Sequence, residues 1–179
     1  MPKKYTKKEF VKLARKKHGR RYCYKKTEYT NGTTPVTITC EKHGDFVINR
    51  AKDHYLSGRG CQICSASAPE RFISEFFIEK RINFNREVGF SNLFLGMPLR
   101  FDFEITINSK KILIEYHGEH HFKKNSSWCD DKKFKHIQDS DVAKREFCNK
   151  NKIEYLELNC FDDEEKIIKK LEKICKIKS

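Results

Sequence analysis

The central segment, residues 99–122, carries acidic and imidazole side chains at a spacing that favours metal chemistry. Alternating apolar and polar residues on both sides of a polar turn predict a β-hairpin. If residues 108–109 alone form the turn, Asp102 faces Glu115, whereas a turn shifted by one residue places Asp102 opposite His117. Opposed residues have Cβ atoms about 4.5–5.5 Å apart. Two carboxylates at that distance repel unless a cation lies between them, so the pattern predicts a divalent-metal site. The alternative is an ordinary edge hairpin with solvated acids.

Four further potential metal ligands stand in two pairs with one spacing. Two residues separate Cys40 from His43 and Cys61 from Cys64, and 17 residues lie between the pairs. This spacing lets both members of a pair reach one ion from a tight turn, and three thiolates with one imidazole complete a tetrahedron. We therefore predict one structural Zn²⁺ per chain, which supplies folding energy to a small module. The alternative is free cysteines beside a surface histidine.

Positive charge is concentrated in the first third of the chain. Of the 179 residues, 37% are apolar and 35% charged, which fits one ordinary domain or two small ones. Residues 1–66 hold 16 basic and 5 acidic residues, a net charge of +11, and residues 67–179 hold 22 and 20, a net charge of +2. This asymmetry predicts a basic module, 1–66, that binds a polyanion, and a second domain, 67–179. A solvated basic surface without a partner is the alternative.

The chain shows no segment that would carry it into or across a membrane. It has no apolar run near the roughly 18 residues of a spanning helix and no signal-peptide pattern. Zinc thiolates also require a reducing compartment. We therefore expect an intracellular protein.

The remaining periodicities predict helices and strands around the hairpin. Four helices are expected: one that begins near residue 6, one after residue 69, one over 138–148 and one that begins at the acids of 162–165. Strands are expected over 36–40, 82–90 and 153–158. Residues 91–98 are expected to form a loop.

Asp102, followed by Glu115, His117, Gly118 and His121, resembles the motif of the PD-(D/E)XK nucleases, in a branch related to the very-short-patch repair endonucleases. The resemblance implies an α/β fold with a mixed sheet flanked by helices. It also implies that Asp102 and Glu115 bind Mg²⁺, with Mn²⁺ as an alternative ion, for hydrolysis of DNA phosphodiester bonds. His117 stands where the family has Asp or Lys, so His117 or His121 would accept the proton of the attacking water or stabilise charge on the phosphate.

The resemblance extends to other residues. The N-terminal segment is similar to a treble-clef-like zinc module that occurs beside nucleases in phage, viral and bacterial proteins. Glu70 matches an acid that approaches the metal site in the family, although Ser67 and Glu70 also form a helix capping box. Asp141 and Lys144 match an Asp-x-x-Lys signature, which implies outer-shell or phosphate-facing roles; an exposed helical ion pair is the alternative.

Two other functions remain open from the sequence. One is a non-catalytic nucleic-acid-binding protein that keeps a degenerate nuclease fold, since His117 replaces the family's lysine. The other is a catalytic zinc held by three neighbouring histidines, His117, His120 and His121.

Overall fold

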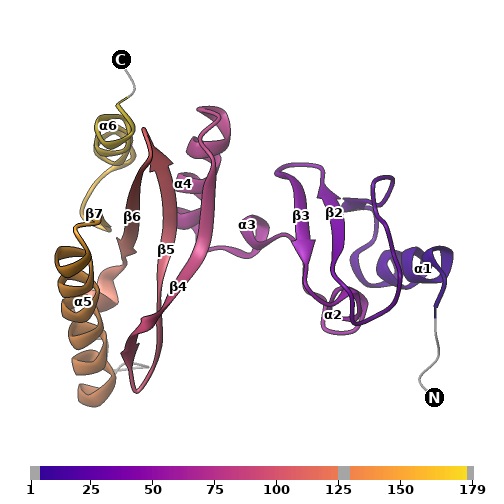
Figure 1. The fold of residues 1–179 in the computed structure, drawn as a ribbon, viewed down its shortest axis with the longest axis horizontal. Coiled ribbons are helices and arrows are strands. Elements are labelled where there is room, and N and C mark those ends of the chain that lie inside the picture. Colours follow the sequence, from indigo (N-terminus) through magenta and orange to yellow (C-terminus); the bar gives the residue numbers. More distant parts are fainter. Residues whose placement is uncertain (1–4, 125–129, 177–179) are drawn as a thin grey trace. The chain divides into compact units, whose positions relative to one another are not determined.

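The computed structural model describes residues 5–124 and 130–176 (Figure 1). The chain divides into two compact units, Met1–Glu75 and Phe76–Ser179. The division falls inside helix α4, Ala68–Glu79.

The N-terminal unit combines a small antiparallel sheet with short helices. Its three strands lie in the order β1-β2-β3, and helix α1 begins with the capping box expected near residue 6, in which Thr6 and Glu9 bind each other's backbone amides. The elements before α4 are α1 (Lys7–His18), β1 (Tyr22–Cys23), β2 (Val36–Cys40), β3 (Gly44–Ile48), α2 (Ala51–Tyr55) and α3 (Gln62–Ser65).

The core of this unit is rich in aromatic rings. Phe10 is fully buried and stacks on Tyr29 with ring centroids 4.7 Å apart. His54 is also fully buried, its Nε2 lies 2.9 Å from the Tyr24 hydroxyl and its Nδ1 lies 2.6 Å from the Arg59 carbonyl oxygen. Burial lowers the pKa of His54 to about 4, so this imidazole is a neutral packing residue at pH 7.

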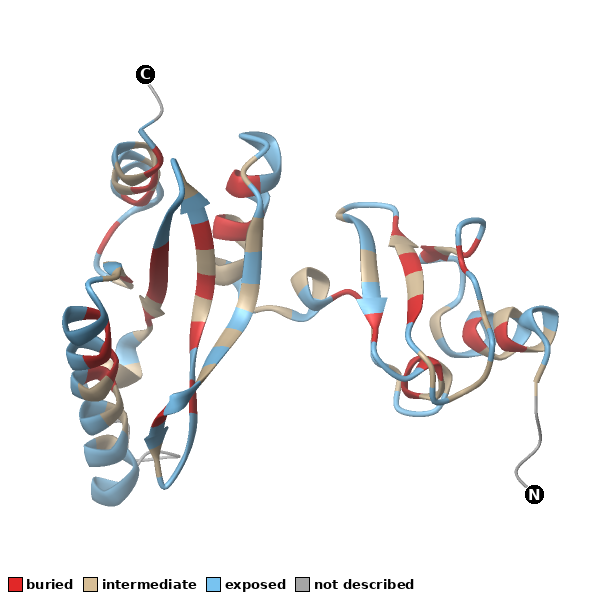
Figure 2. Cartoon of the chain, viewed as in Figure 1, coloured by how far each residue is buried: buried red, intermediate tan, exposed pale blue. Residues whose placement is uncertain are grey.

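The C-terminal unit is a mixed four-stranded sheet flanked by helices. The strand order is β4-β5-β6-β7, and the pairs are antiparallel except for the parallel β6–β7 pair. Figure 2 shows the buried positions that lie along β5 and β6. The elements after α4 are β4 (Phe84–Leu95), β5 (Met97–Ile107), β6 (Lys110–His117), the 3₁₀ turn η1 (Glu119–His121), α5 (Asp131–Asn151), β7 (Glu154–Asn159) and α6 (Glu164–Cys175).

Helices pack on the sheet through aromatic contacts. Phe77 of α4 contacts Phe103 of β5 with ring centroids 5.7 Å apart. Phe147 of α5 belongs to a separate buried cluster with Phe101 and Leu113. The two helices therefore pack against different aromatic residues of β5, α4 against Phe103 and α5 against Phe101.

Two expectations about this unit are wrong. The predicted loop 91–98 is the tip of a long hairpin, in which β4 runs to Leu95 and turns at Gly96 with φ of 67°. Leu93 and Leu99 belong to the buried cluster of Phe101, and this burial explains why the β4–β5 hairpin extends through the polar residues near its tip. Helix α5 begins well before residue 138, because the Asp130 side chain accepts a hydrogen bond from the Lys133 amide and caps it.

Candidate metal centres and the acidic pair

The central hairpin adopts the first of the two predicted registers. Both residues of the turn Asn108–Ser109 have positive φ, 50° and 63°, as a two-residue hairpin turn requires. Ile107 pairs with Lys110, and counting back along both strands brings Asp102 opposite Glu115. The prediction that these two acids meet is therefore confirmed, and the alternative register is wrong.

Side chains replace ladder hydrogen bonds at this point of the sheet. The regular pairing of β5 with β6 extends to Phe103 and Ile114. Beyond it, the Asp102 amide donates to Oε2 of Glu115 at 3.3 Å, and the Tyr116 amide donates to Oδ2 of Asp102 at 2.8 Å. The two carboxylates are thus held against each other by the opposing backbone.

The surroundings of Glu115 make its negative charge unfavourable, which favours a cation beside it. Its exposed fraction is 5%, and burial together with the Asp102 charge raises the pKa of Glu115 to about 8. Lys144 of α5, itself 8% exposed, forms an ion pair with Oε1 of Glu115. The register and the charge effect of Asp102 on Glu115 thus bring two carboxylates, one of them buried, close together at this point of the sheet.

The Asp-x-x-Lys pair on α5 does not form an exposed helical ion pair. Asp141 and Lys144 are both buried, and each points to its own partner: Lys144 to Glu115, and Asp141 to His121. Their i, i+3 spacing correctly placed both side chains on one helix face. No pattern in the sequence indicates that this face contacts Glu115 directly.

Two histidines gather around Asp141. His121 Nδ1 lies 2.8 Å from Oδ2 of Asp141, and His117 Nε2 lies 3.7 Å from Oδ1. The imidazole rings of His117 and His121 stack with centroids 4.3 Å apart. Burial lowers the pKa of His117 to about 4, which keeps its ring neutral. The histidine trio considered above is therefore replaced, among the described residues, by a group with Asp141 in place of His120.

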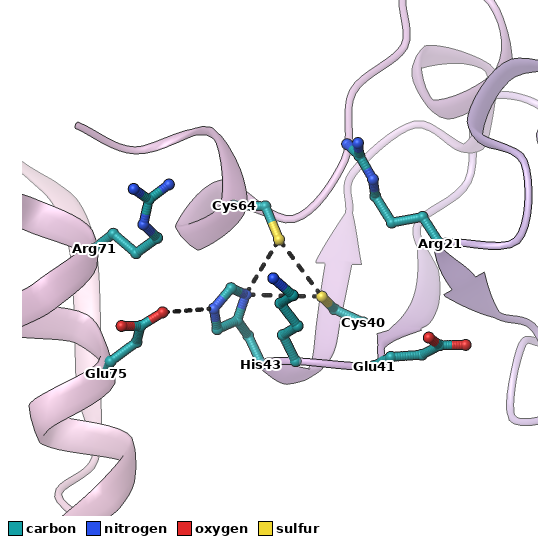
Figure 3. Close-up of a pocket in the computed structure, with 8 residues that line it drawn as sticks. Arg21, Cys40, Glu41, His43, Cys64, Arg71 and Glu75 are labelled. Carbon is teal, nitrogen blue, oxygen red and sulfur yellow. Dashed lines mark hydrogen bonds and ion pairs between the residues drawn. The ribbon is translucent and has the colours of Figure 1, made fainter. Parts of the chain in front are cut away.

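The four zinc-ligand candidates of the N-terminal unit converge on one point, and Figure 3 shows three of them, Cys40, His43 and Cys64. His43 Nδ1 lies 3.4 Å from the sulfur of Cys61 and 3.3 Å from that of Cys64, and the sulfurs of Cys40 and Cys64 are 3.7 Å apart. The edges of a tetrahedron around Zn²⁺ are about 3.8 Å between two thiolates and about 3.6 Å between a thiolate and an imidazole. The cluster can therefore hold a metal such as zinc.

Local structure explains this convergence. Cys40 ends β2, and the tight turn into β3 returns His43 to the same side, while Cys61 and Cys64 flank the start of the short helix α3. On the other side of the ring, His43 Nε2 lies 3.4 Å from Oε1 of Glu75 (Figure 3). A carboxylate in this position fixes the tautomer that presents Nδ1 to a metal. Sequence reasoning missed this role of Glu75.

Glu70 is engaged at the start of α4. The Ser67 hydroxyl donates to Oε1 of Glu70 at 2.8 Å, and the Glu70 amide lies 3.4 Å from the Ser67 oxygen. These contacts support the capping alternative. A role for Glu70 at the metal pair stays a prediction.

Comparison with known proteins connects the N-terminal unit to a family without an assigned function. A family model described as a protein of unknown function (DUF723) matches residues 3–65, the region that contains all four zinc-ligand candidates. The match covers about a third of the chain. No solved structure gives a significant match.

The chain is also similar to uncharacterized proteins of Acanthamoeba polyphaga mimivirus. One is 32% identical over 156 residues, which cover 83% of this chain and 48% of that protein. Two others are 38% and 40% identical over 61 and 58 residues, about a third of this chain and 22% of each relative. The chain thus spans at most about half the length of these relatives. Within the described residues, no helix has the length and apolar character needed to cross a membrane.

Proposed function

We propose that the protein is a metal-dependent DNA endonuclease with a PD-(D/E)XK-like core in its C-terminal unit. The contact between Asp102, Glu115 and Lys144 carries this proposal. It unites two carboxylates and a lysine, the three side-chain types of the nuclease motif, although the lysine comes from α5. Lys144 thus supplies the cation that position 117 lacks.

Each member of this group has a distinct task. Asp102 and Glu115 would hold Mg²⁺, or Mn²⁺ in its place, which polarises the scissile phosphate and lowers the pKa of a bound water. Lys144 lowers the pKa of Glu115 against the opposing effects of burial and Asp102, and it adds positive charge where the pentacovalent phosphate becomes more negative. His117 and His121 remain the candidates for the group that takes the water's proton.

The N-terminal unit supplies the grip on DNA in this proposal. Its Cys/His cluster holds a structural zinc with four protein ligands, so no position is left for chemistry there. The ligand-bearing turn, the strands and the short helix α3 are the parts expected of a treble-clef-like module. The mimivirus relatives support a virus-encoded protein.

Cleavage of supercoiled plasmid by the full chain tests the proposal. We expect nicked or linear product with Mg²⁺ or Mn²⁺ and none with EDTA. Zinc alone, which fits the thiolate site, should not replace Mg²⁺. A protein that leaves every DNA form intact with every one of these metals contradicts the enzyme assignment.

A specific observation favours non-catalytic DNA binding as the second candidate. Both carboxylate oxygens of Glu115 are engaged, one by Lys144 and one by the Asp102 amide. A buried ion pair of this kind also serves as a structural element. An inert protein that still binds DNA tightly would support this function instead.

Removal of charge from α1 should weaken DNA binding more than equal removal elsewhere. We expect the triple variant Lys8→Ala, Lys12→Ala, Arg15→Ala to bind DNA more weakly than the wild type. The slope of log K against log salt concentration should become shallower by up to about 0.9 for each phosphate contact that is lost. These side chains are exposed on one helix. Binding is measured by fluorescence anisotropy over a range of salt concentrations.

The matched control removes three exposed helical lysines of the C-terminal unit, Lys135, Lys150 and Lys173. Replacing these three lysines by Ala removes the same number of positive charges from helical positions as the α1 variant does. Equal loss of affinity in both triple variants would mean that overall charge, and not the N-terminal unit, determines binding.

A further inference from the structure

A second group of metal-type ligands lies in the C-terminal unit, apart from the Cys/His cluster. It comprises His117 at the end of β6, His121 in η1 and Asp141 on α5, whose ligand atoms all lie within 4.8 Å of one another. The three residues come from three consecutive elements of the chain. Two imidazoles and one carboxylate are a donor set suited to zinc and to other divalent transition metals.

The interior of this group contains an unpartnered polar atom. His117 is 3% exposed, and its Nε2 is buried without a hydrogen-bond partner in the part of the chain that the structure describes. That nitrogen faces Oδ1 of Asp141 at 3.7 Å and Oε1 of Glu157 at 3.9 Å, too far for hydrogen bonds. Buried polar atoms are nearly always satisfied, so an unsatisfied imidazole nitrogen aimed at carboxylates indicates a missing occupant.

The spacing of the ligand atoms suits a metal ion. With bonds of about 2.0–2.1 Å to imidazole and carboxylate, neighbouring ligand atoms around a tetrahedral Zn²⁺ lie about 3.4 Å apart. The distances of 2.8 Å for His121 to Asp141 and 3.7 Å for His117 to Asp141 lie on either side of this value. The rings of His117 and His121 are stacked with an interplanar angle of 9°, so one imidazole must turn about its side-chain torsions before both nitrogens point at one ion.

We propose that His117, His121 and Asp141 bind a divalent transition metal, with Zn²⁺ as the ion that the donor set fits. Glu157 is engaged by Arg145 at 2.7 Å and is not counted as a ligand. Three protein ligands leave one coordination position open for water or a phosphate oxygen. When the metal is bound both imidazoles are ligands, so the proton-accepting role considered above for His117 or His121 applies to the metal-free site. The proposal stands whether or not the protein cleaves DNA.

Cobalt titration of the full chain tests this site. Protein whose Cys/His cluster is loaded with zinc should bind one further equivalent of Co²⁺, with visible d–d absorption and without a thiolate-to-cobalt charge-transfer band. Asp141→Asn keeps a hydrogen-bonding group beside His121 but removes the charge, and we expect it to weaken Co²⁺ binding at least tenfold. His121→Gln should do the same.

Matched variants identify the ligands. His120→Gln changes the neighbouring imidazole outside the group and should bind Co²⁺ as the wild type does. The proposal is overturned if zinc-loaded wild type binds no cobalt, or if Asp141→Asn and His121→Gln bind it normally. If both ligand variants unfold, paramagnetic shifts of the His117 and His121 ring protons in the wild type decide: their absence on Co²⁺ addition overturns the proposal.

Discussion

Replacing Asp102 by Asn should abolish plasmid cleavage and leave the fold intact. The amide keeps the shape of the side chain and can still accept a hydrogen bond from the Tyr116 amide. It lacks the negative charge that a hard divalent cation requires. A bound metal contributes several kcal/mol to transition-state stabilisation, and each 1.36 kcal/mol is tenfold in rate, so we expect a loss on the order of a hundredfold or more.

Glu115→Gln should lose activity for the same reason, but it also leaves the buried Lys144 without its carboxylate partner and should lower the melting temperature. Burial and the neighbouring carboxylate make an ionised Glu115 costly in the fold. In EDTA, Asp102→Asn relieves the repulsion and keeps the Lys144–Glu115 pair, so it is expected to melt at a higher temperature than the wild type, as shown by circular dichroism. Asp139→Asn, an exposed substitution of the same kind on α5, is the control and should cleave normally. Full cleavage by Asp102→Asn would remove the acidic pair from the active site.

Cys61→Ser should cost the N-terminal unit both its metal and its fold. Structural zinc contributes about 10–16 kcal/mol to the folding of small zinc-finger peptides, which equals or exceeds the entire stability of a typical domain. We expect the variant to contain one equivalent of zinc less than the wild type by elemental analysis. Its tyrosine-rich core should lose its near-ultraviolet circular dichroism, and residues 5–66 should become sensitive to protease.

Cys23→Ser provides the matched control, because Cys23 lies on β1 and is not among the four clustered ligands. It should retain its zinc and its fold. Well-folded wild-type protein without any zinc would rule out the structural metal site.

The parts of the molecule set by local rules could be predicted from the sequence. Counting residues from the turn left two registers open, and the two-residue turn at Asn108–Ser109 selects the one that brings Asp102 opposite Glu115. The equal spacing of the two ligand pairs likewise predicted the Cys/His cluster. In both cases the information lies within a few residues of a turn.

Contacts between distant elements could not be predicted in the same way. Nothing local to Lys144 specifies that α5 packs where its ammonium reaches Glu115, since that depends on how Phe147 and Leu113 pack together. The grouping of Asp141 with His117 and His121 arises from the same docking. The length of the β4–β5 hairpin was missed because its polar residues interrupt the alternation, although Leu93 and Leu99 are buried.

The hairpin turn also bears on the order in which the molecule assembles. Asp102 and the Glu115 carboxylate interact across a sequence separation of 13 residues, whereas Lys144 and Glu115 are 29 residues apart. The entropy cost of loop closure rises with separation, and hairpins form within about 1–10 μs. The two acids therefore come together before α5 brings its lysine to them. Before α5 docks, Glu115 is still open to water and only its repulsion from Asp102 opposes the pairing. We therefore expect acid or divalent salt in the refolding buffer to accelerate the step that builds the sheet.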